Sequence, residues 1–274
     1  MLDLLILPLI AALVILAMHA YLGLHVIARG IIFVDLAFAQ IAALGATVAF
    51  LLGAGHGGPL TFGLSLGFTL LGALLFAFTR RDHPRVPQEA IIGIVYVIAG
   101  AAVILLSSFS ADGAEHIKET LTGSLIWVDG PTVARMTIVY LAIGAVHYVF
   151  RRPFLALSFS PGELERDRLW DILFYATFGI VITFSVAITG VLMVFSTLVI
   201  PGVIAFFYTA RFRTALFIAW ASGTVAVLAG LGISFTWDVT TGPVLVCTFG
   251  AVLIVAMALR PLYAARTRGP AATP

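Results

Sequence analysis

Charged residues are scarce in this sequence, and cysteine is almost absent. Of its 274 residues, 10% are charged and 61% are hydrophobic, and the mean hydropathy is +1.13. Soluble domains carry roughly 25% charged residues, so this composition excludes an ordinary soluble domain and indicates a protein of the lipid bilayer. The single cysteine, Cys247, excludes an internal disulfide and a cysteine-based metal site.

Several motifs that carry catalytic chemistry are also missing. The sequence has no Gly-x-x-x-x-Gly-Lys-Ser/Thr phosphate loop, no His-Glu-x-x-His, no Gly-x-Ser-x-Gly and no Cys-x-x-Cys. We therefore expect a pathway through a membrane rather than an enzyme. We also expect no cofactor bound by this chain and no nucleic-acid partner.

What is present is a series of apolar runs of about 20 residues, the length that an α-helix needs to cross a hydrocarbon core of ~30 Å. No basic region precedes the first run, which favours a retained helix over a cleaved signal peptide. We predict an all-α polytopic membrane protein with about nine transmembrane helices. They fall near residues 4–22, 31–52, 60–79, 90–108, 132–150, 170–188, 190–209, 214–234 and 243–260.

The positions of the basic residues predict the topology. Lys and Arg concentrate in cytoplasmic loops, and 13 of the 15 basic residues lie in four connections and the C-terminal end. The connections 53–59, 109–131 and 235–242 together hold one lysine and five acidic residues. This alternation predicts an N-terminus outside and a C-terminus in the cytoplasm if residues 170–209 cross twice, with a weak boundary at Thr189-Gly190. Eight crossings with one re-entrant segment is the alternative.

No connection is long enough for a second folded domain. We expect a single transmembrane domain, residues 1–265, and a short cytoplasmic tail, residues 266–274. The segment HIKETLTGSLIWV, residues 116–128, is amphipathic and predicts a short external helix lying against the bundle.

Two polar side chains interrupt the second apolar run. A carboxylate in a membrane helix is costly, and it is therefore a functional candidate by default. Asp35 heads a stripe of small residues at helical spacing, Ala39, Ala42 and Ala46. Gln40 lies about 140° away from Asp35 around a regular helix, so the two side chains face different ways. Both are candidates for a transport pathway; the alternatives are a local cap or pair for Asp35, with Arg29 as its partner, and an interhelical hydrogen bond for Gln40.

Three further features are candidates for function. Glu89 opens the fourth run, where a carboxylate either belongs to the pathway or interacts with the helix dipole. Pro201-Gly202 predicts a kink or a broken helix, which transporters tolerate where backbone lines a cavity. The polar segment SPGELERDRLWD, residues 160–171, is either a docking surface for a cytoplasmic partner or a solvated loop, and Glu163 to Asp171 could form a short helix along the membrane surface.

Six segments carry a resemblance over residues 8–260. They are ARGIIFVDLAFAQIAALG (28–45), QEAIIGIVYVIAGAAVILLS (88–107), LTGSLIWV (121–128), LALSFSPGELERDRLWDILFY (155–175), ITGVLMVFSTLVIPGVIA (188–205) and SFTWDVTTGP (234–243). Together and in this order, they resemble the permease subunit of the metal-type ATP-binding-cassette (ABC) importers, which take up zinc, manganese or iron.

The resemblance implies a bacterial-type inner or plasma membrane protein that moves a divalent metal ion into the cytoplasm. It implies a homodimer, or a pair of similar subunits, enclosing one pathway among membrane lipid. It further implies an extracytoplasmic metal-binding protein and two cytoplasmic ABC ATPases that dock on residues 155–171. The ATPase-coupling loop would comprise Ser160, Pro161, Gly162, Glu163 and Leu164.

The same resemblance implies roles for the intramembrane carboxylates. Asp35 aligns with the family's pathway carboxylate and would be a metal ligand, and Glu89 aligns with an Asp in the fourth span. In the family a histidine follows the first Asp by four residues, whereas this sequence has Ala39 there. The nearby amide of Gln40 is a poor ligand for zinc.

Two other classes of function stay open on the residues alone. A self-sufficient secondary transporter would use Asp35 and Glu89 as proton or ion carriers. A membrane scaffold would use its polar residues only to hold helices together.

Overall fold

The computed structural model describes residues 2–54, 58–79, 86–160 and 167–267. Within these ranges the chain is helical and contains no strand. The elements are α1 (Leu2–Ala28), α2 (Val34–Leu51), α3 (Pro59–Thr79), α4 (Gln88–Ser107), α5 (Gly113–Thr122), the 3₁₀ helix η1 (Leu125–Trp127), α6 (Gly130–Val149), α7 (Arg151–Phe159), α8 (Asp167–Tyr208), α9 (Phe212–Trp237) and α10 (Thr241–Thr267).

The prediction of a helical membrane protein is confirmed. Among the described residues, eight helices are long and apolar enough to cross a bilayer: α1, α2, α3, α4, α6, α8, α9 and α10. Seven of them each coincide with one predicted run, whereas α8 spans the runs 170–188 and 190–209. The predicted external helix corresponds to α5 and η1. Helix α7 was not predicted, because its residues were assigned to a connection between two apolar runs.

Helix α8 is bent at Gly190, where φ is 73° and ψ is 168°. Before the bend, Asp171 forms an ion pair with Arg29 at the end of α1. Beyond the other end of α8, the ring centroid of Phe212 lies 5.4 Å from that of His25. His25 is in α1, one turn before Arg29. Both ends of α8 therefore lie at the same end of the bundle, and the bend lies at the other. The parts of α8 before and after Gly190, its first and second arms, match the predicted runs 170–188 and 190–209. The number of crossings and the orientation of the termini stay predictions.

The helical torsion angles of α8 are interrupted at Gly190 rather than at Pro201 and Gly202. Those two residues lie inside the helical second arm, where α1 packs closely. A Cβ added at Gly202 would lie 2.6 Å from Ile27 Cδ1. The second arm stays helical around Pro201 because a membrane helix packed against neighbours can re-satisfy the carbonyl that a proline frees.

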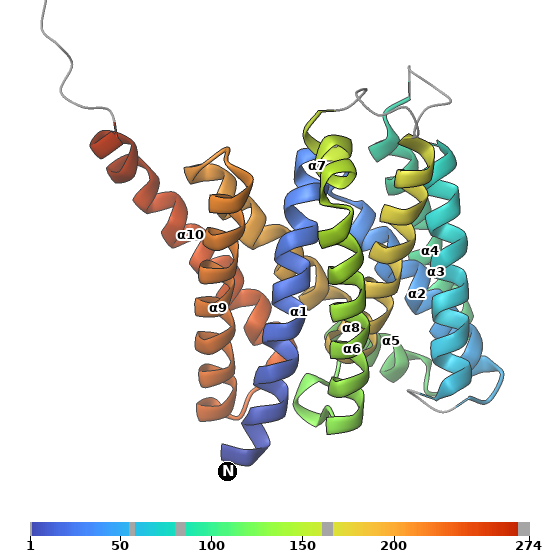
Figure 1. Cartoon of the computed structure of the whole chain (residues 1–274). Helices are drawn as coiled ribbons and strands as arrows, with labels where there is room; N and C mark the ends of the chain where they lie inside the picture. The colour runs from blue at the N-terminus through green and yellow to red at the C-terminus, as the bar shows by residue number, and fades with distance from the viewer. Residues whose placement is uncertain (1, 55–57, 80–85, 161–166, 268–274) are drawn as a thin grey trace, which may run out of the picture.

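Basic and acidic residues gather at opposite ends of the bundle, whose helices Figure 1 shows. One end, which we call the basic end, holds the end of α1, α7 and the beginnings of α8 and α9, with Arg29, Arg151, Arg152, Arg168, Arg211 and Arg213. The opposite, acidic end holds the N-terminus, α5 and the turn between α9 and α10, with Asp112, Glu115, Glu119, Asp129 and Asp238.

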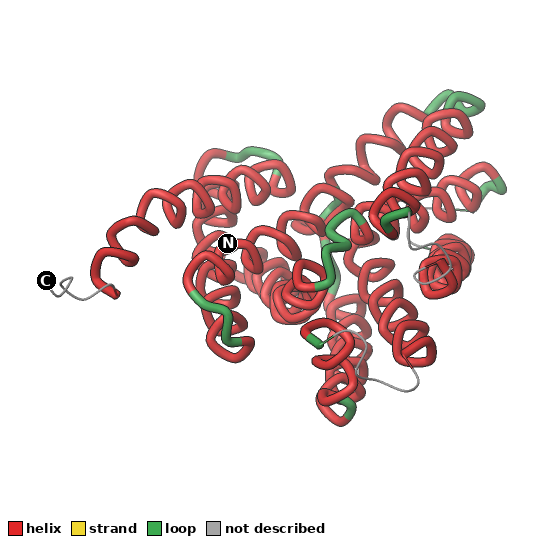
Figure 2. Tube along the Cα trace, turned by 90° about the horizontal axis from the view of Figure 1, so that it is seen from above, coloured by secondary structure: helices red, strands yellow, loops and turns green. Residues whose placement is uncertain are grey.

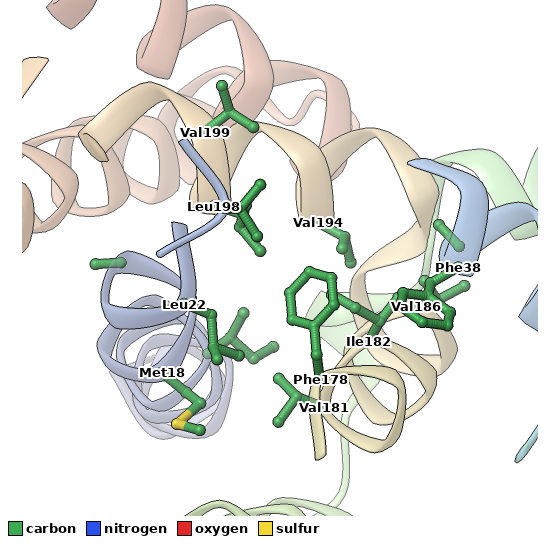
Figure 3. Close-up of a cluster of buried hydrophobic side chains, with 14 of the residues drawn as sticks. Met18, Leu22, Phe38, Phe178, Val181, Ile182, Val186, Val194, Leu198 and Val199 are labelled. Carbon is green, nitrogen blue, oxygen red and sulfur yellow. The ribbon is translucent and has the colours of Figure 1, made fainter. Parts of the chain in front are cut away.

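The core lies between α1, α2 and the two arms of α8. Figure 3 shows Met18 and Leu22 of α1 facing Phe178 and Ile182 of the first arm and Leu198 of the second. In contrast, α10 leans away from the bundle (Figure 2) and buries little of its length. It ends at Thr267 and so includes the first two residues of the predicted tail, 266–274.

Candidate functional site

A cavity of about 750 Å³ lies toward the acidic end, between α2, α3, α5, α6 and the first arm of α8. Alanines of α2 and a phenylalanine from each of α3 and α8 form its apolar wall. Its polar lining comes from Thr61, Ser65, His116, Glu119, Thr120, Ser124, Asp129, Thr132, Arg135 and Thr183. A cavity of this volume can hold a hydrated ion or a small ligand.

The rim of the cavity carries a fixed negative charge at Asp129. This residue caps α6, because its carboxylate accepts a hydrogen bond from the backbone N–H of Thr132 at 2.9 Å. Hydrogen bonding from Thr132 holds the pKa of Asp129 below its ordinary value of 3.8. Asp129 is therefore ionised at neutral pH, and it adds to the attraction of cations toward the cavity.

His116 faces the cavity from α5 but is engaged with α2. Its ring stacks on Phe50 with 4.6 Å between ring centroids, and its Nε2 lies 3.1 Å from Thr47 Oγ1. Among the residues that the structure describes, no three His, Cys, Asp or Glu side chains are grouped to hold a metal. The cavity of one chain can thus attract cations, but its described residues do not form a three-ligand metal site.

Asp35 lies in the first turn of α2 and is fully buried. Neither of its carboxylate oxygens has a hydrogen-bond partner among the described residues. Of the predicted stripe on its face of the helix, Ala42 and Ala46 line the cavity. Ala42 lies seven positions after Asp35, which corresponds to about 10 Å along the helix axis. Asp35 therefore lies on the same face of α2 as the alanines that line the cavity, about two turns away.

Gln40 and Glu89 lie elsewhere. Gln40 is half-buried and faces α4, where its Oε1 would lie 3.6 Å from a Cβ added at Gly100. Glu89 Oε1 accepts a hydrogen bond from the backbone N–H of Phe33 at 2.9 Å, just before α2 begins. As predicted, Asp35 and Gln40 face different ways. The three predicted pathway residues do not line the cavity.

Arg29 is paired differently from the alternative drawn from the sequence. Its Nη2 donates to Asp171 Oδ1 at 2.6 Å and to Tyr175 Oη at 3.2 Å, rather than to Asp35. Gln88 also donates to Tyr175 Oη, at 3.0 Å, so that this network joins α1, α4 and α8. Sequence reasoning missed it because Arg29 and Asp171 are 142 residues apart. The sequence signal that could have indicated this network is Asp171, an aspartate at the start of an apolar run.

The predicted coupling loop lies mostly outside the described residues. Ser160 caps the end of α7, whereas Pro161, Gly162, Glu163 and Leu164 fall in the range 161–166, which the structure does not describe. Helix α7 itself is anchored to the bundle. Ser158 Oγ lies 2.7 Å from His25 Nδ1, and the ring of Phe154 stacks on His147 at 4.0 Å.

His19 and His147 are buried and hydrogen-bonded inside the bundle. His19 lies 2.8 Å from both Ser185 Oγ and Thr197 Oγ1 and so links the two arms of α8. His147 Nε2 lies 2.9 Å from Thr177 Oγ1. These contacts hold α1 and α6 against α8.

Comparison with known proteins identifies the family. Residues 1–260 match the model of the ABC 3 transport family. The structure of PsaBC from Streptococcus pneumoniae in complex with Fab has the same fold, with a TM-score of 0.76 at 20% identity, covering 93% of this chain and 91% of that chain.

Curated relatives agree with this match. The "Probable iron transport system membrane protein" of Haemophilus influenzae is 25% identical over 183 residues, which cover 65% of this chain and 67% of the relative. The manganese transport system membrane protein MntC of Halalkalibacterium halodurans is 22% identical over 253 residues, 90% of this chain and 84% of the relative. With the family model matching nearly the whole chain, this protein belongs to the ABC 3 transport family, as a multi-pass bacterial plasma membrane permease of the metal-transporting ABC importers.

Proposed function

We propose that this chain is the membrane-spanning subunit through which an importer moves a divalent transition-metal ion, zinc, manganese or iron, into the cytoplasm. The observation that carries this proposal is the face of α2 that runs from the cavity to Asp35. A buried carboxylate without a partner is costly in a membrane protein. A passing divalent cation would offset that cost, so Asp35 is suited to a transient contact with the ion.

Energy would come from another chain. Because the sequence has no phosphate loop, the proposal assigns ATP hydrolysis to separate cytoplasmic ABC ATPase subunits. They would dock on the predicted coupling loop, Ser160 to Leu164, which follows α7 in the sequence. ATP binding can drive alternating access only if it favours one state of the permease over the other.

Delivery of the ion and completion of the pathway would require two more partners. An extracytoplasmic metal-binding protein would release the ion at the acidic end, where Glu119 and Asp129 lie on the cavity. A second copy of the permease, or a similar subunit, would flank the pathway. The lack of a three-ligand cluster in the described part of one chain supports this second copy.

The test is uptake by the purified complex in proteoliposomes, with the binding protein added outside and ATP enclosed. We expect one of zinc, manganese or iron to accumulate with ATP, and accumulation to stop when the ATPase carries an inactivating substitution of its catalytic glutamate. Competition among the three ions would then identify the substrate. Co-purification from native membranes with no ATPase chain would contradict the proposal.

A secondary ion transporter is the second candidate, and the observation that favours it is that the Asp35 carboxylate has no hydrogen-bond partner among the described residues. Such a transporter would use Asp35 as a proton or ion carrier. Uptake that a protonophore abolishes and that ATP depletion leaves unchanged would favour this candidate.

A further inference from the structure

One helical turn at the end of α1, residues 25–29, contacts both elements that flank the predicted coupling loop. On the α7 side, Ser158 Oγ lies 2.7 Å from His25 Nδ1, a hydrogen-bond distance. On the α8 side, Asp171 forms its 2.6 Å ion pair with Arg29. His25 and Arg29 are four residues apart and therefore lie on the same face of the helix. We call residues 25–29 the α1 end turn.

Both contacts are buried in the bundle. The rings of Tyr21, Phe174 and Phe212 surround the imidazole of His25, with 4.8 to 6.0 Å between ring centroids. These rings come from α1, α8 and α9, so they fix the imidazole from several sides. The bond from His25 to Ser158 therefore ties the end of α7 to a side chain that is itself held in place.

The α1 end turn continues into α2 through a short connection with its own hydrogen bonds. Gly30, whose φ is 66°, ends the turn, and its N–H bonds to the carbonyl of Ile27 at 3.1 Å. The N–H of Val34 bonds to the carbonyl of Ile31 at 3.1 Å, where α2 begins. Asp35 is the second residue of α2. A displacement of the α1 end turn would thus be passed on to Asp35 rather than absorbed by a loose loop.

We propose that His25 and Arg29 are positioning residues that couple the ATPase to Asp35. When the ATPase displaces α7 and the beginning of α8, these two side chains move the α1 end turn and, through it, the first turn of α2. The inference deepens the proposed function and rests on it. Coupling between distant sites is carried by packed and hydrogen-bonded groups that both sites can bias. Here every contact in that chain joins residues that the structure describes.

The first measurement is the amount of metal taken up per ATP hydrolysed, with the complex in proteoliposomes. Ser158→Ala removes the hydroxyl at the end of α7, and His25→Phe removes its partner but keeps an aromatic ring. We expect each variant to keep ATP hydrolysis and to lower uptake per ATP roughly tenfold. Ser158→Thr keeps the hydroxyl and should restore the ratio. A purely structural role would instead lower uptake and hydrolysis together.

The ion pair is tested by a variant that is expected to fold. Arg29→Met with Asp171→Leu replaces the two charges by apolar side chains of similar size, a change that buried ion pairs often tolerate. We expect this variant also to hydrolyse ATP with reduced uptake. Combined with Ser158→Ala, it should lower uptake per ATP further, because both flanks then lose their contact with the α1 end turn.

A second measurement needs no metal. A spin label is attached at Phe33→Cys in a chain that carries Cys247→Ser; Phe33 is exposed and lies just before α2. We expect ATP with vanadate to change the mobility of the label, and Ser158→Ala to abolish that change. Failure of uptake, which would contradict the proposed function, is therefore observed separately from failure of this inference.

The matched control breaks a contact of α1 outside the end turn. Trp220→Phe removes the hydrogen bond from Trp220 Nε1 to the carbonyl of Ala17, and uptake per ATP should stay unchanged. Three results would each overturn the inference. They are an equal loss of coupling with Trp220→Phe, full coupling in the Ser158→Ala and apolar-pair variants, and a label at residue 33 that does not respond to ATP in the chain with native contacts.

Discussion

Two buried aspartates of this chain lie in opposite environments. Asp171 faces the guanidinium of Arg29 at 2.6 Å, and both side chains are almost completely buried. Asp35 is equally buried, but its oxygens have no partner among the described residues. A buried charge is stable only when it is paired and hydrogen-bonded. Asp171 therefore stabilises the bundle through its pair, whereas Asp35 is suited to a ligand that comes and goes.

Asp35→Asn should lower the initial rate of metal uptake without loss of folded protein. Losing about 1.4 kcal/mol of stabilisation of the passing ion would slow uptake roughly tenfold. The amide is neutral and nearly isosteric, so thermal stability in detergent should be unchanged or higher. Glu89→Gln is the matched variant, because its amide oxygen can still accept the bond from Phe33 and uptake should fall less. Full uptake by Asp35→Asn would make this carboxylate structural.

Asp171→Ala should destabilise the folded protein by about 3–5 kcal/mol, because it leaves the buried charge of Arg29 without its carboxylate. The measurement is unfolding in mixed detergent micelles, followed by tryptophan fluorescence. Asp112→Ala removes an exposed carboxylate and should change the free energy of unfolding by less than about 0.5 kcal/mol. Replacing both partners, with Arg29→Met and Asp171→Leu, should recover much of the loss. Equal stability of the two alanine variants would show that the pair contributes little.

Among the elements, the bend of α8 depends on two glycines in contact. Gly190 and Gly123 have φ angles of 73° and 66° with extended ψ, a region open essentially only to glycine. A Cβ at Gly190 would lie 2.4 Å from the backbone nitrogen of Gly123. The N–H of Ser124 then bonds to the carbonyl of Ile188 at 3.1 Å. The loop after α5 thus fixes the point at which α8 turns back.

Gly190→Ala should therefore cost about 1–3 kcal/mol from the torsion angles alone, with a further cost from the contact with Gly123. The variant should unfold at a lower temperature and label faster at cysteines placed beside the bend. Gly144→Ala is the matched control, because this glycine of α6 has open space where a Cβ would be. It should gain about 0.5–1 kcal/mol from helix propensity. A neutral Gly190→Ala would show that the bend does not need glycine.

For the whole molecule, the separation of charge between the two ends supports the predicted orientation. Arginines gather where α1 ends and α7 begins, and acidic residues gather around α5. Because basic loops stay in the cytoplasm, the cavity would open to the outside. The basic end would then lie on its cytoplasmic side.

We accordingly predict that a tag at the N-terminus of the intact protein is accessible from outside the cell and that a tag at the C-terminus is protected until the membrane is opened. The two arms of α8 give the odd number of crossings that this arrangement requires. Protease digestion of intact and permeabilised cells measures both tags. Tags on the same side would contradict nine crossings and favour the re-entrant alternative.

The sequence by itself determined the membrane bundle, most helix positions, the acidic and basic connections and the family resemblance. These follow from hydropathy, turn residues and charge, which are properties of short consecutive segments. Asp35 was identified for the same reason, since a carboxylate is conspicuous within an apolar run.

Only the tertiary structure decided which side chains meet. It paired Arg29 with Asp171, turned Gln40 toward α4, and placed the bend of α8 at Gly190 rather than at Pro201. These contacts join helices far apart in the chain. They depend on how the helices pack, and in a bilayer, where lipid is as apolar as most side chains, hydropathy does not specify which faces of the helices meet.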